Sequence, residues 1–347
     1  MKLVENPYRG GAKLAHDAPY PSTDAARAAR LFERILPSGK TPLILADALA
    51  GSGTLWIKDE RGRMGMGSFK ALGAAYVIAT HASEKAQVPD HSTLSGSTYV
   101  TASAGNHGLS VAFGAKTFGA EAVVYIADTV PESFADRLRT QGAQVRQEGV
   151  DYAASMAAAA AAAETQGWIL LSDSSWTGYY DLPHRLMEGY LQMAAETVSQ
   201  MSHVPSHIFL QAGVGGMACA LATHFREAWG DGPQIIVVEP DAAPALQESI
   251  LAGACVFADG PDSIMGRLDC KEPSLIALNG LARDADYFVT LSDTKVASVL
   301  PRLAQTGFST TASGGAGVVA SLDDAVGAQL GIDADSHVLC FLSETAE

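Results

Sequence analysis

Short apolar runs rich in β-branched and aromatic residues alternate with longer, alanine-rich amphipathic stretches along most of the chain. The apolar runs predict strands at residues 55–58, 98–101, 122–126, 145–147, 168–171, 207–210, 235–239 and 338–342. The stretches between them predict helices at residues 69–80, 107–118, 131–142, 152–166, 183–201 and 216–229. Alternation of this kind is typical of parallel sheets covered by helices, so we expect an α/β fold.

The chain is expected to divide into two domains. It contains no internal repeat and no long linker, and the alanine-rich run at residues 153–163 favours a helix rather than a disordered tract. We predict a smaller α/β domain, residues 75–183, inserted into a larger domain formed by residues 1–74 and 184–347. The charged residues 58–61 are expected to form a solvated or ion-paired strand end.

Composition and charge narrow the class of protein and of partner. Of the 347 residues, 48% are hydrophobic and 18% are charged, which is enough for a large core. The net charge of −15 argues against nucleic acid or an anionic membrane as a partner, but it allows a local basic site for a phosphate. The first residues lack the character of a signal peptide, and no apolar run is long enough to span a bilayer. We therefore expect a cytoplasmic protein.

The cysteines do not indicate a metal site or a disulfide framework. Cys219, Cys255, Cys270 and Cys340 are widely spaced and form no CxxC pair. We expect buried or incidental thiols and no bound metal, with pairing of Cys255 and Cys270 left open.

The first candidate chemistry lies in two segments of small and polar residues. Lys70 ends the sequence Gly-Ser-Phe-Lys at residues 67–70, and residues 103–108 read Ser-Ala-Gly-Asn-His-Gly. A lysine among small and apolar residues can lose its proton and form an imine with an aldehyde. A turn between a strand and a helix can bind a substrate carboxylate through its N–H groups, and the Asn106 amide can donate to a cofactor hydroxyl. The pair predicts pyridoxal 5′-phosphate as the cofactor.

A third segment, residues 211–217, follows a predicted strand and reads Gln-Ala-Gly-Val-Gly-Gly-Met. Its glycines leave backbone N–H groups free to face a phosphate at the start of a helix. The same residues also fit the dinucleotide pattern GxGxxG/A, with Glu239 roughly where a ribose-binding acid would lie. An NAD-dependent oxidoreductase is therefore an alternative, but it leaves Lys70 and Asn106 without a role.

Together these segments resemble the fold-type II pyridoxal-phosphate enzymes, the tryptophan synthase β-like group, and within it the diaminopropionate ammonia-lyases. Residues 58–60 and 65–76 match the lyase pattern KDE…GxxxFKxLGxxY, and residues 173–179 resemble DTxWxGY. Residues 263–273, Ser-Ile-Met-Gly-Arg-Leu-Asp-Cys-Lys-Glu-Pro, resemble the lyase segment TIMAGLACGEP. The resemblance implies two open, twisted, mostly parallel sheets with helices on both faces, an active site in the cleft between the domains, and a homodimer.

The resemblance also implies roles for individual residues. Lys70 would bind the cofactor and carry a proton, and Asp173 would lie near the distal amine of a small amino-acid substrate. Ser343 would face the ring nitrogen of the cofactor. The further cofactor-binding residues would be Asn106, Gly213, Val214, Gly215, Gly216 and Met217, and the substrate-binding residues would be Ser103, Ala104, Gly105 and His107. The implied reaction is α,β-elimination from 2,3-diaminopropionate or a related amino acid, giving pyruvate or another 2-oxo acid and ammonia.

One position departs from the lyase pattern. The lyases carry TDGNHG, in which the aspartate is credited with handling D-substrates, whereas this chain has Ala104 at that place. The variant is more similar to serine/threonine dehydratases, so a serine/threonine or hydroxyaspartate dehydratase is a second alternative. Because a methyl group cannot take a proton, we expect L-substrates to be used and D-diaminopropionate to react weakly or not at all.

Overall fold

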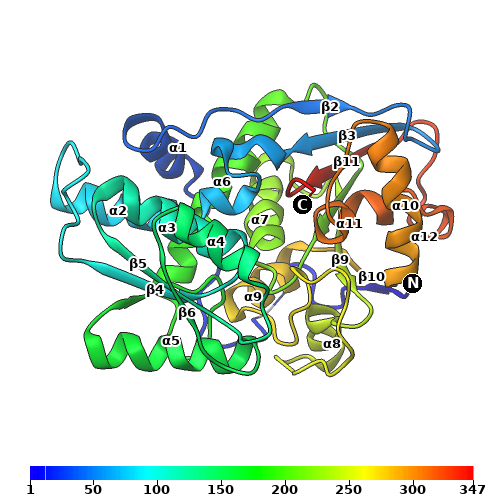
Figure 1. Ribbon diagram of the computed structural model, residues 1–347. Coiled ribbons are helices and arrows are strands. Elements are labelled where there is room, and N and C mark those ends of the chain that lie inside the picture. Colours follow the sequence, from blue (N-terminus) through cyan, green and yellow to red (C-terminus); the bar gives the residue numbers. More distant parts are fainter. Residues whose placement is uncertain (12, 347) are drawn as a thin grey trace.

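The computed structural model describes residues 1–11 and 13–346, which form two β-sheets with helices packed on both (Figure 1). The larger sheet contains β1 (Leu3–Glu5), β2 (Leu43–Leu45), β3 (Thr54–Asp59), β8 (His207–Gln211), β9 (Gln234–Pro240), β10 (Tyr287–Leu291) and β11 (His337–Leu342). Their order is β1-β10-β9-β8-β11-β3-β2. The inner strands are parallel, and β1 and β2 pair antiparallel at the two edges.

Helices cover both faces of the larger sheet. Side chains of a strand point alternately to opposite faces. In β8, Ile208 and Leu210 pack with α6 (Asp181–Gln200), α7 (Gly216–Trp229) and α9 (Leu275–Asp284). Phe209, between them, packs with α10 (Asp293–Gln305), α11 (Ala312–Ser321) and α12 (Asp324–Leu330). Because both faces are covered, β8 is apolar at consecutive positions, as is typical of a buried parallel strand.

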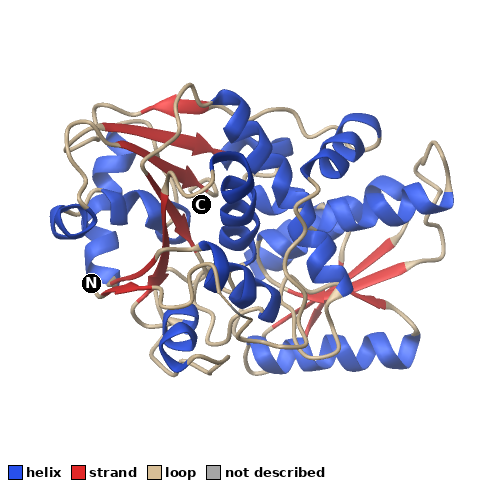
Figure 2. Cartoon of the chain, turned by 180° about the vertical axis from the view of Figure 1, so that it is seen from behind, coloured by secondary structure: helices blue, strands red, loops and turns tan. Residues whose placement is uncertain are grey.

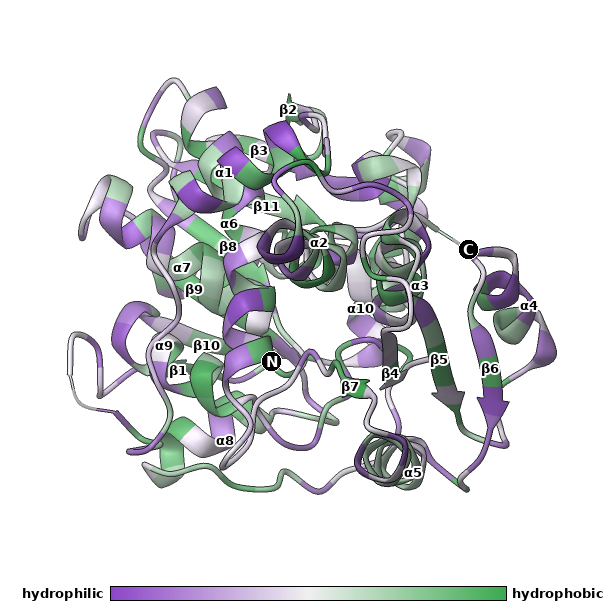
Figure 3. Cartoon of the chain, turned by 90° about the vertical axis from the view of Figure 1, so that its left-hand side faces the viewer, coloured by the Kyte–Doolittle hydropathy of each residue, from purple (hydrophilic) through white to green (hydrophobic). Residues whose placement is uncertain are grey.

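The smaller sheet is parallel throughout and has the order β6-β5-β4-β7, with β4 (Thr98–Ala102), β5 (Glu121–Ile126), β6 (Gln144–Gln147) and β7 (Ile169–Leu170). One face packs against α2 (Ala74–Lys85), α3 (Asn106–Phe118) and α4 (Glu132–Thr140). The other face packs against α5 (Tyr152–Gln166), as Figures 1 and 2 show. The inner strand β5 is largely hydrophobic and the edge strand β6 largely hydrophilic (Figure 3).

The α/β fold with mostly parallel sheets is confirmed, and each strand predicted from the sequence has a counterpart in the structure. The strands of the smaller sheet all lie between residues 98 and 170. The division into domains at residues 74 and 184 stays a prediction.

The sequence pattern assigned no element between residues 240 and 337, where the structure has α8 (Ala245–Ala252), α9, β10, α10, α11 and α12. It also missed β1, β2 and α1 (Ala25–Arg34). The helix α11 shows why, since it contains several glycines, which have low helix propensity. A Cβ on Gly317 would lie 2.7 Å from Oε1 of Gln211, so this helix is kept by close packing against β8 rather than by local preference.

The helix predicted at residues 69–80 is broken. A short 3₁₀ segment, η2 (Phe69–Leu72), is followed by Gly73 with φ −85° and ψ −87°, and α2 starts only at Ala74. A Cβ at Gly73 would lie 2.8 Å from the hydroxyl oxygen of Tyr190 on α6, so the glycine allows this close approach. The break is therefore set by a residue more than a hundred positions away, which a local pattern does not reveal.

The charged strand end at residues 58–61 is ion-paired and mostly buried. Lys58 Nζ lies 2.8 Å from Glu196 Oε2 on α6, and Arg63 Nη2 lies 2.7 Å from the same oxygen. Arg63 Nε also lies 2.7 Å from Glu60 Oε2, and all four side chains are at most 2% exposed. These four residues, the Glu196 cluster, join β3 and the 3₁₀ segment η1 (Glu60–Gly65) to α6.

The cysteines and the helices bear on the expectations about a disulfide and about the membrane. All four cysteines are free thiols, so Cys255 and Cys270 do not pair. Within residues 1–11 and 13–346, none of the helices combines the length and the apolar character that crossing a membrane requires.

Candidate active site

Lys70 lies in η2, directly after β3 and η1, and its ammonium group forms an ion pair with the carboxylate of Asp173. Both side chains are mostly enclosed, with exposed fractions of 24% and 17%. Burial alone would lower the pKa of Lys70, but the Asp173 carboxylate outweighs it, and the net pKa is raised. Burial alone would raise the pKa of Asp173, but the Lys70 ammonium outweighs it and holds that pKa below its usual range. The two groups are therefore a cation and an anion at neutral pH.

Tyr190 adds a buried phenol to the surroundings of Lys70. Its ring centroid lies 5.0 Å from that of Phe69, the residue before the lysine. Burial raises the pKa of Tyr190, and its hydroxyl makes no hydrogen bond to any described residue. A buried polar atom without a partner is unusual in a native interior and points to a group that the chain alone does not supply.

The segment at residues 103–108 follows β4, as predicted, and its last three residues form the first turn of α3. Gly105 precedes the first turn of α3, and no side chain caps that helix end, so its N–H groups are available to an anion. Asn106 Nδ2 donates to Glu344 Oε2 over 2.6 Å. The neighbouring Ser103 and Ala104 are half-buried at the same turn.

His107 turns toward the main chain of the small sheet. Its Nε2 lies 2.9 Å from the carbonyl oxygen of Leu171, which fixes Nε2 as the donor. Burial lowers the pKa of His107, so the imidazole is neutral. Leu171 lies two residues before Asp173, so this hydrogen bond holds the turn against the segment that carries the carboxylate.

The glycine-rich loop joins β8 to α7. Gly215 adopts φ +93°, a left-handed conformation that favours glycine, and no side chain caps the start of α7. A Cβ on Gly213 would lie 2.9 Å from Cys270 Sγ and 3.1 Å from the carbonyl oxygen of Arg267. The loop therefore needs glycine at both positions and presents the open N-terminus of a helix, which suits a phosphate.

The loop and the Lys70 pair belong to one site, because a Cβ on Gly216 would lie 3.9 Å from the backbone oxygen of Asp173. The Val214 carbonyl oxygen accepts a hydrogen bond from the Ser274 N–H over 2.9 Å, and Met217 is buried in the first turn of α7. Ser343 follows β11, and its carbonyl oxygen accepts from the N–H of Phe69 over 3.0 Å, beside Lys70.

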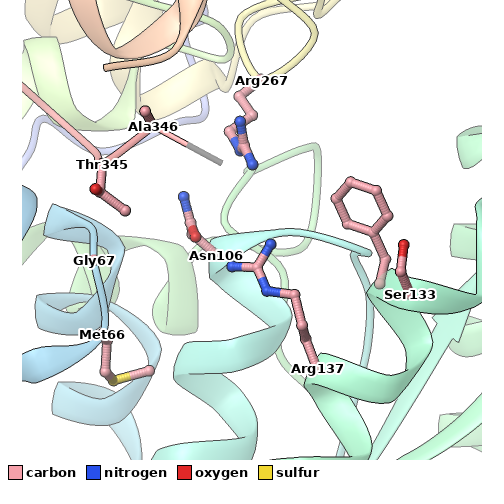
Figure 4. Close-up of a pocket in the computed structure, with 9 residues that line it drawn as sticks. Met66, Gly67, Asn106, Ser133, Arg137, Arg267, Thr345 and Ala346 are labelled. Carbon is pink, nitrogen blue, oxygen red and sulfur yellow. The ribbon is translucent and has the colours of Figure 1, made fainter. Parts of the chain in front are cut away.

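Glu344 and two arginines were not predicted as site residues. The Glu344 carboxylate is buried and accepts hydrogen bonds from Asn106, from Arg267 Nη1 over 3.0 Å and from Thr311. Arg267 and Arg137 line a cavity of about 440 Å³, with Met66, Gly67, Asn106, Ser133, Phe134, Thr345 and Ala346 (Figure 4). Arg267 lies within residues 263–273, the segment that resembles the lyase sequence TIMAGLACGEP. Only the structure shows that it shares the Glu344 carboxylate with Asn106.

Glu239, the acidic residue that would bind a ribose if the chain bound a dinucleotide, has another role in the structure. The Glu239 carboxylate is 1% exposed and accepts from the N–H groups of Leu246 over 2.7 Å and Gln247 over 2.8 Å, at the start of α8. Burial raises the pKa of Glu239 to about 8. Because the Glu239 side chain is buried and already accepts two N–H groups of α8, it is not available to bind a ribose hydroxyl.

The residues fit pyridoxal phosphate. Lys70 has an amine that could bind its aldehyde, the loop with Gly213 and Gly215 has a cradle that a Cβ would fill, and the Tyr190 hydroxyl is an orphaned donor beside the lysine. Among the described residues, no group of three or more His, Cys, Asp or Glu side chains is arranged to hold a metal ion.

Comparisons with known proteins agree with this chemistry. Residues 35–344 match the family model described as "Pyridoxal-phosphate dependent enzyme". The diaminopropionate ammonia-lyase of Salmonella typhimurium is 33% identical over 329 residues, covering 85% of this chain and 81% of the relative. The crystal structure of the Escherichia coli diaminopropionate ammonia-lyase in complex with D-serine is similar with a TM-score of 0.86 and 28% identity, covering 99% of this chain and 93% of that one. The human L-serine dehydratase/L-threonine deaminase is 27% identical, covering 59% of this chain and 60% of the relative.

Proposed function

The chain belongs to the pyridoxal-phosphate dependent enzymes, and from that premise we propose that it is an ammonia-lyase acting on 2,3-diaminopropionate or a related small amino acid. The reaction is an α,β-elimination that yields pyruvate, or another 2-oxo acid, and ammonia. Its cofactor is pyridoxal phosphate, as the family match and the lysine site indicate, rather than a dinucleotide.

The observation that carries this proposal is the enclosed ion pair between Lys70 and Asp173. It places a proton-carrying amine and an anionic carboxylate in one site, next to the glycine-rich loop. A substrate with an amino group on its β-carbon presents a cation, and an enclosed carboxylate is the group that recognises such a cation.

The roles of the residues follow from their chemistry. Lys70 would hold the cofactor through Nζ, and its amine is the base that would take the proton from the α-carbon of the substrate. Bound pyridoxal phosphate supplies an electron sink for the negative charge that develops at this carbon. Asp173 holds the β-ammonium group until it leaves as ammonia. The N–H groups at Gly105 and at the start of α3 hold the α-carboxylate, with Ser103, Ala104 and His107 shaping that turn.

The remaining site residues orient the cofactor. Gly213, Val214, Gly215, Gly216 and Met217 would hold the phosphate at the N-terminus of α7. Asn106 would bind the ring hydroxyl, and the Ser343 hydroxyl would be the partner of the ring nitrogen. A hydroxyl partner would leave that nitrogen neutral, because a carboxylate would be needed to hold the protonated ring.

Ala104 is the observation that favours a serine/threonine dehydratase as the second candidate function. Its side chain cannot take a proton, and the serine/threonine dehydratases carry the same kind of turn. For a hydroxy amino acid the leaving group is water and one ammonia is formed. The same alanine supports the preference for L-substrates.

The proposal extends to assembly, location and domain structure. We infer a homodimer from the family resemblance, a cytoplasmic location from the sequence composition, and domains of residues 1–74 plus 184–347 and 75–183. Light scattering of the purified protein tests the dimer, and a single-chain mass would refute it.

Product analysis of the holoenzyme tests the function. Diaminopropionate should give pyruvate with two equivalents of ammonia, measured by coupled oxidation of NADH and by an ammonia assay. Threonine, if it reacts, should give 2-oxobutyrate with one equivalent. Turnover of threonine or serine at least as efficient as that of diaminopropionate would make the dehydratase the correct assignment.

A further inference from the structure

Tyr190 of α6 is buried beside Lys70, and none of the steps above uses its hydroxyl. The residue is 1% exposed, and the hydroxyl has no hydrogen-bond partner among the described residues. A buried hydroxyl that bonds to nothing costs free energy, because it has given up water and gained no replacement. A catalytic role is a recognised reason for a protein to keep such a group.

The Tyr190 hydroxyl lies against the segment that carries Lys70. Its ring centroid is 5.0 Å from that of Phe69, and a Cβ on Gly73 would lie 2.8 Å from the hydroxyl oxygen. The Gly73 N–H donates to the Lys70 carbonyl oxygen over 3.0 Å, so the phenol touches the same turn as the lysine. The packing of α6 on η2 therefore brings this hydroxyl to the lysine from a distant part of the chain.

The hydroxyl is near enough to Lys70 to influence its charge. Burial lowers the pKa of Lys70, and the Asp173 carboxylate and then the Tyr190 hydroxyl oppose this effect, so that the net pKa is raised. Burial raises the pKa of Tyr190 itself, so the phenol is uncharged at pH 7. Further titratable groups that interact with Lys70 come from three other parts of the chain, and they are Cys270, His107 and Tyr152. Of the carboxylate and the phenol, the carboxylate bonds to the lysine in this structure and the phenol does not.

The two partners suit different states of the lysine. An ammonium group paired with a carboxylate has no lone pair and cannot remove a proton. When the β-ammonium group of a substrate takes the Asp173 carboxylate, as proposed above, Lys70 loses that partner. Its flexible four-carbon stem lets the amine turn to the phenol oxygen of Tyr190. A neutral oxygen can accept one N–H of the amine and leave the lone pair free.

We propose that Tyr190 is a positioning residue for Lys70, its hydroxyl oxygen accepting an N–H of the free amine so that the lone pair faces the substrate α-carbon. This inference rests on the proposed elimination of ammonia. The Cα–H bond breaks, its proton goes to Nζ, and its electron pair forms the bond between Cα and Cβ as ammonia leaves with the pair of the Cβ–N bond. The ammonium group formed on Lys70 keeps its hydrogen bond to the phenol oxygen, and that bond is stronger to a cation than to an amine.

The test follows the α-proton of the substrate in three holoenzymes, wild type, Tyr190→Phe and Tyr76→Phe. Proton NMR in D2O records the loss of the α-proton signal from L-diaminopropionate and from L-serine, and pyruvate is measured in the same samples. Tyr76→Phe is the matched control, because Tyr76 is also buried but its hydroxyl donates to Glu188 of α6 over 2.6 Å.

We expect Tyr190→Phe to remove the α-proton of saturating diaminopropionate about 10- to 150-fold more slowly than wild type, because a hydrogen bond to a developing cation is lost. Serine has a neutral hydroxyl that leaves Asp173 on Lys70, so its rate should fall by at most about threefold. Tyr76→Phe should change neither rate. Equal losses with the two substrates in Tyr190→Phe, or no loss with diaminopropionate, would overturn the proposal.

The same experiment separates this inference from the proposed function. If wild type exchanges the α-proton of diaminopropionate for deuterium without forming pyruvate, the elimination is refuted, and the exchange rates of the variants still decide the role of Tyr190. If wild type neither exchanges the proton nor forms pyruvate, Lys70 is not the base for this amino acid and both proposals fail.

The stability of the cofactor-free protein provides a measurement without turnover. Because the Tyr190 hydroxyl is unbonded there, Tyr190→Phe should unfold at a urea concentration equal to or higher than that of wild type. Tyr76→Phe loses the bond to Glu188 and should unfold at a lower urea concentration. A lower midpoint for Tyr190→Phe would show that its hydroxyl supports the fold rather than the lysine, and would overturn the proposal.

Discussion

Replacing Asp173 with asparagine removes the carboxylate that pairs with the Lys70 ammonium group. The carboxylate is 17% exposed, and the lysine holds its pKa below the usual range, so it is ionised throughout the neutral range. If it binds the β-ammonium group of diaminopropionate, a charge-assisted hydrogen bond is lost, worth about 1.5–3 kcal/mol. That corresponds to a fall in kcat/KM of about 10- to 150-fold.

The effect should depend on the charge of the β-substituent. L-Serine has the same carbon skeleton but a neutral hydroxyl, so Asp173→Asn should lower its kcat/KM by only about threefold. The assay is pyruvate release from each substrate at saturating cofactor, and Asp128→Asn, a change of the same charge at an exposed position, is the control. Equal losses with the two substrates would refute a role for Asp173 in recognising the cation.

The rate at which the cofactor-free protein binds pyridoxal phosphate is a second measure of the pair formed by Lys70 and Asp173. The Asp173 carboxylate raises the pKa of Lys70, so the amine is protonated at neutral pH and must lose a proton before it binds an aldehyde. In wild type, loading of the cofactor-free protein should accelerate as the pH rises. In Asp173→Asn the carboxylate that most strongly opposes the effect of burial is gone, so the pKa of Lys70 falls and loading at pH 7 should be faster than in wild type. Slower loading in the variant, followed by absorbance, would contradict this electrostatic account.

Three other changes test separate parts of the molecule. Gly213→Ala places a methyl group 2.9 Å from Cys270 Sγ, so the dissociation constant of pyridoxal phosphate in a fluorescence titration should rise at least about tenfold; an unchanged constant would exclude the loop as the phosphate site. Glu196→Gln leaves the buried Lys58 without its anion and Arg63 with Glu60 alone, and it should lower the free energy of unfolding by about 3 kcal/mol in urea titrations, whereas a loss below about 1 kcal/mol would show that the cluster relaxes. Ala104→Asp restores a proton-accepting group at the turn and should raise turnover of D-diaminopropionate relative to the L-isomer, and efficient D-isomer turnover by wild type would contradict the stated preference.

The sequence was sufficient where local chemistry decides the structure. Apolar runs such as that of β8 became inner strands because both faces of the sheet are covered. Lys70 was singled out from the small residues before it and the glycines at 213 and 215 from the loop they form, and their roles toward the cofactor stay predictions. These features depend on neighbours in the chain, which a sequence shows directly.

The features that escaped prediction depend on contacts between distant residues. Gly73 breaks a helix because Tyr190 of α6 lies against it. Glu344 reaches the site because Asn106, 238 positions earlier, donates to it. The arginine pair exists only because a loop and α4 face the same cavity, and no spacing in the sequence indicates that arrangement.

The central claim is that Lys70 holds the cofactor. Reduction of the holoenzyme with borohydride, followed by proteolysis and peptide mass spectrometry, tests it most directly, since reduction makes the bond between the lysine and the cofactor permanent. The account predicts a phosphopyridoxyl group on Lys70 and its absence from Lys70→Ala. Stoichiometric modification of a different lysine in the wild-type protein, with Lys70 unmodified, would contradict it.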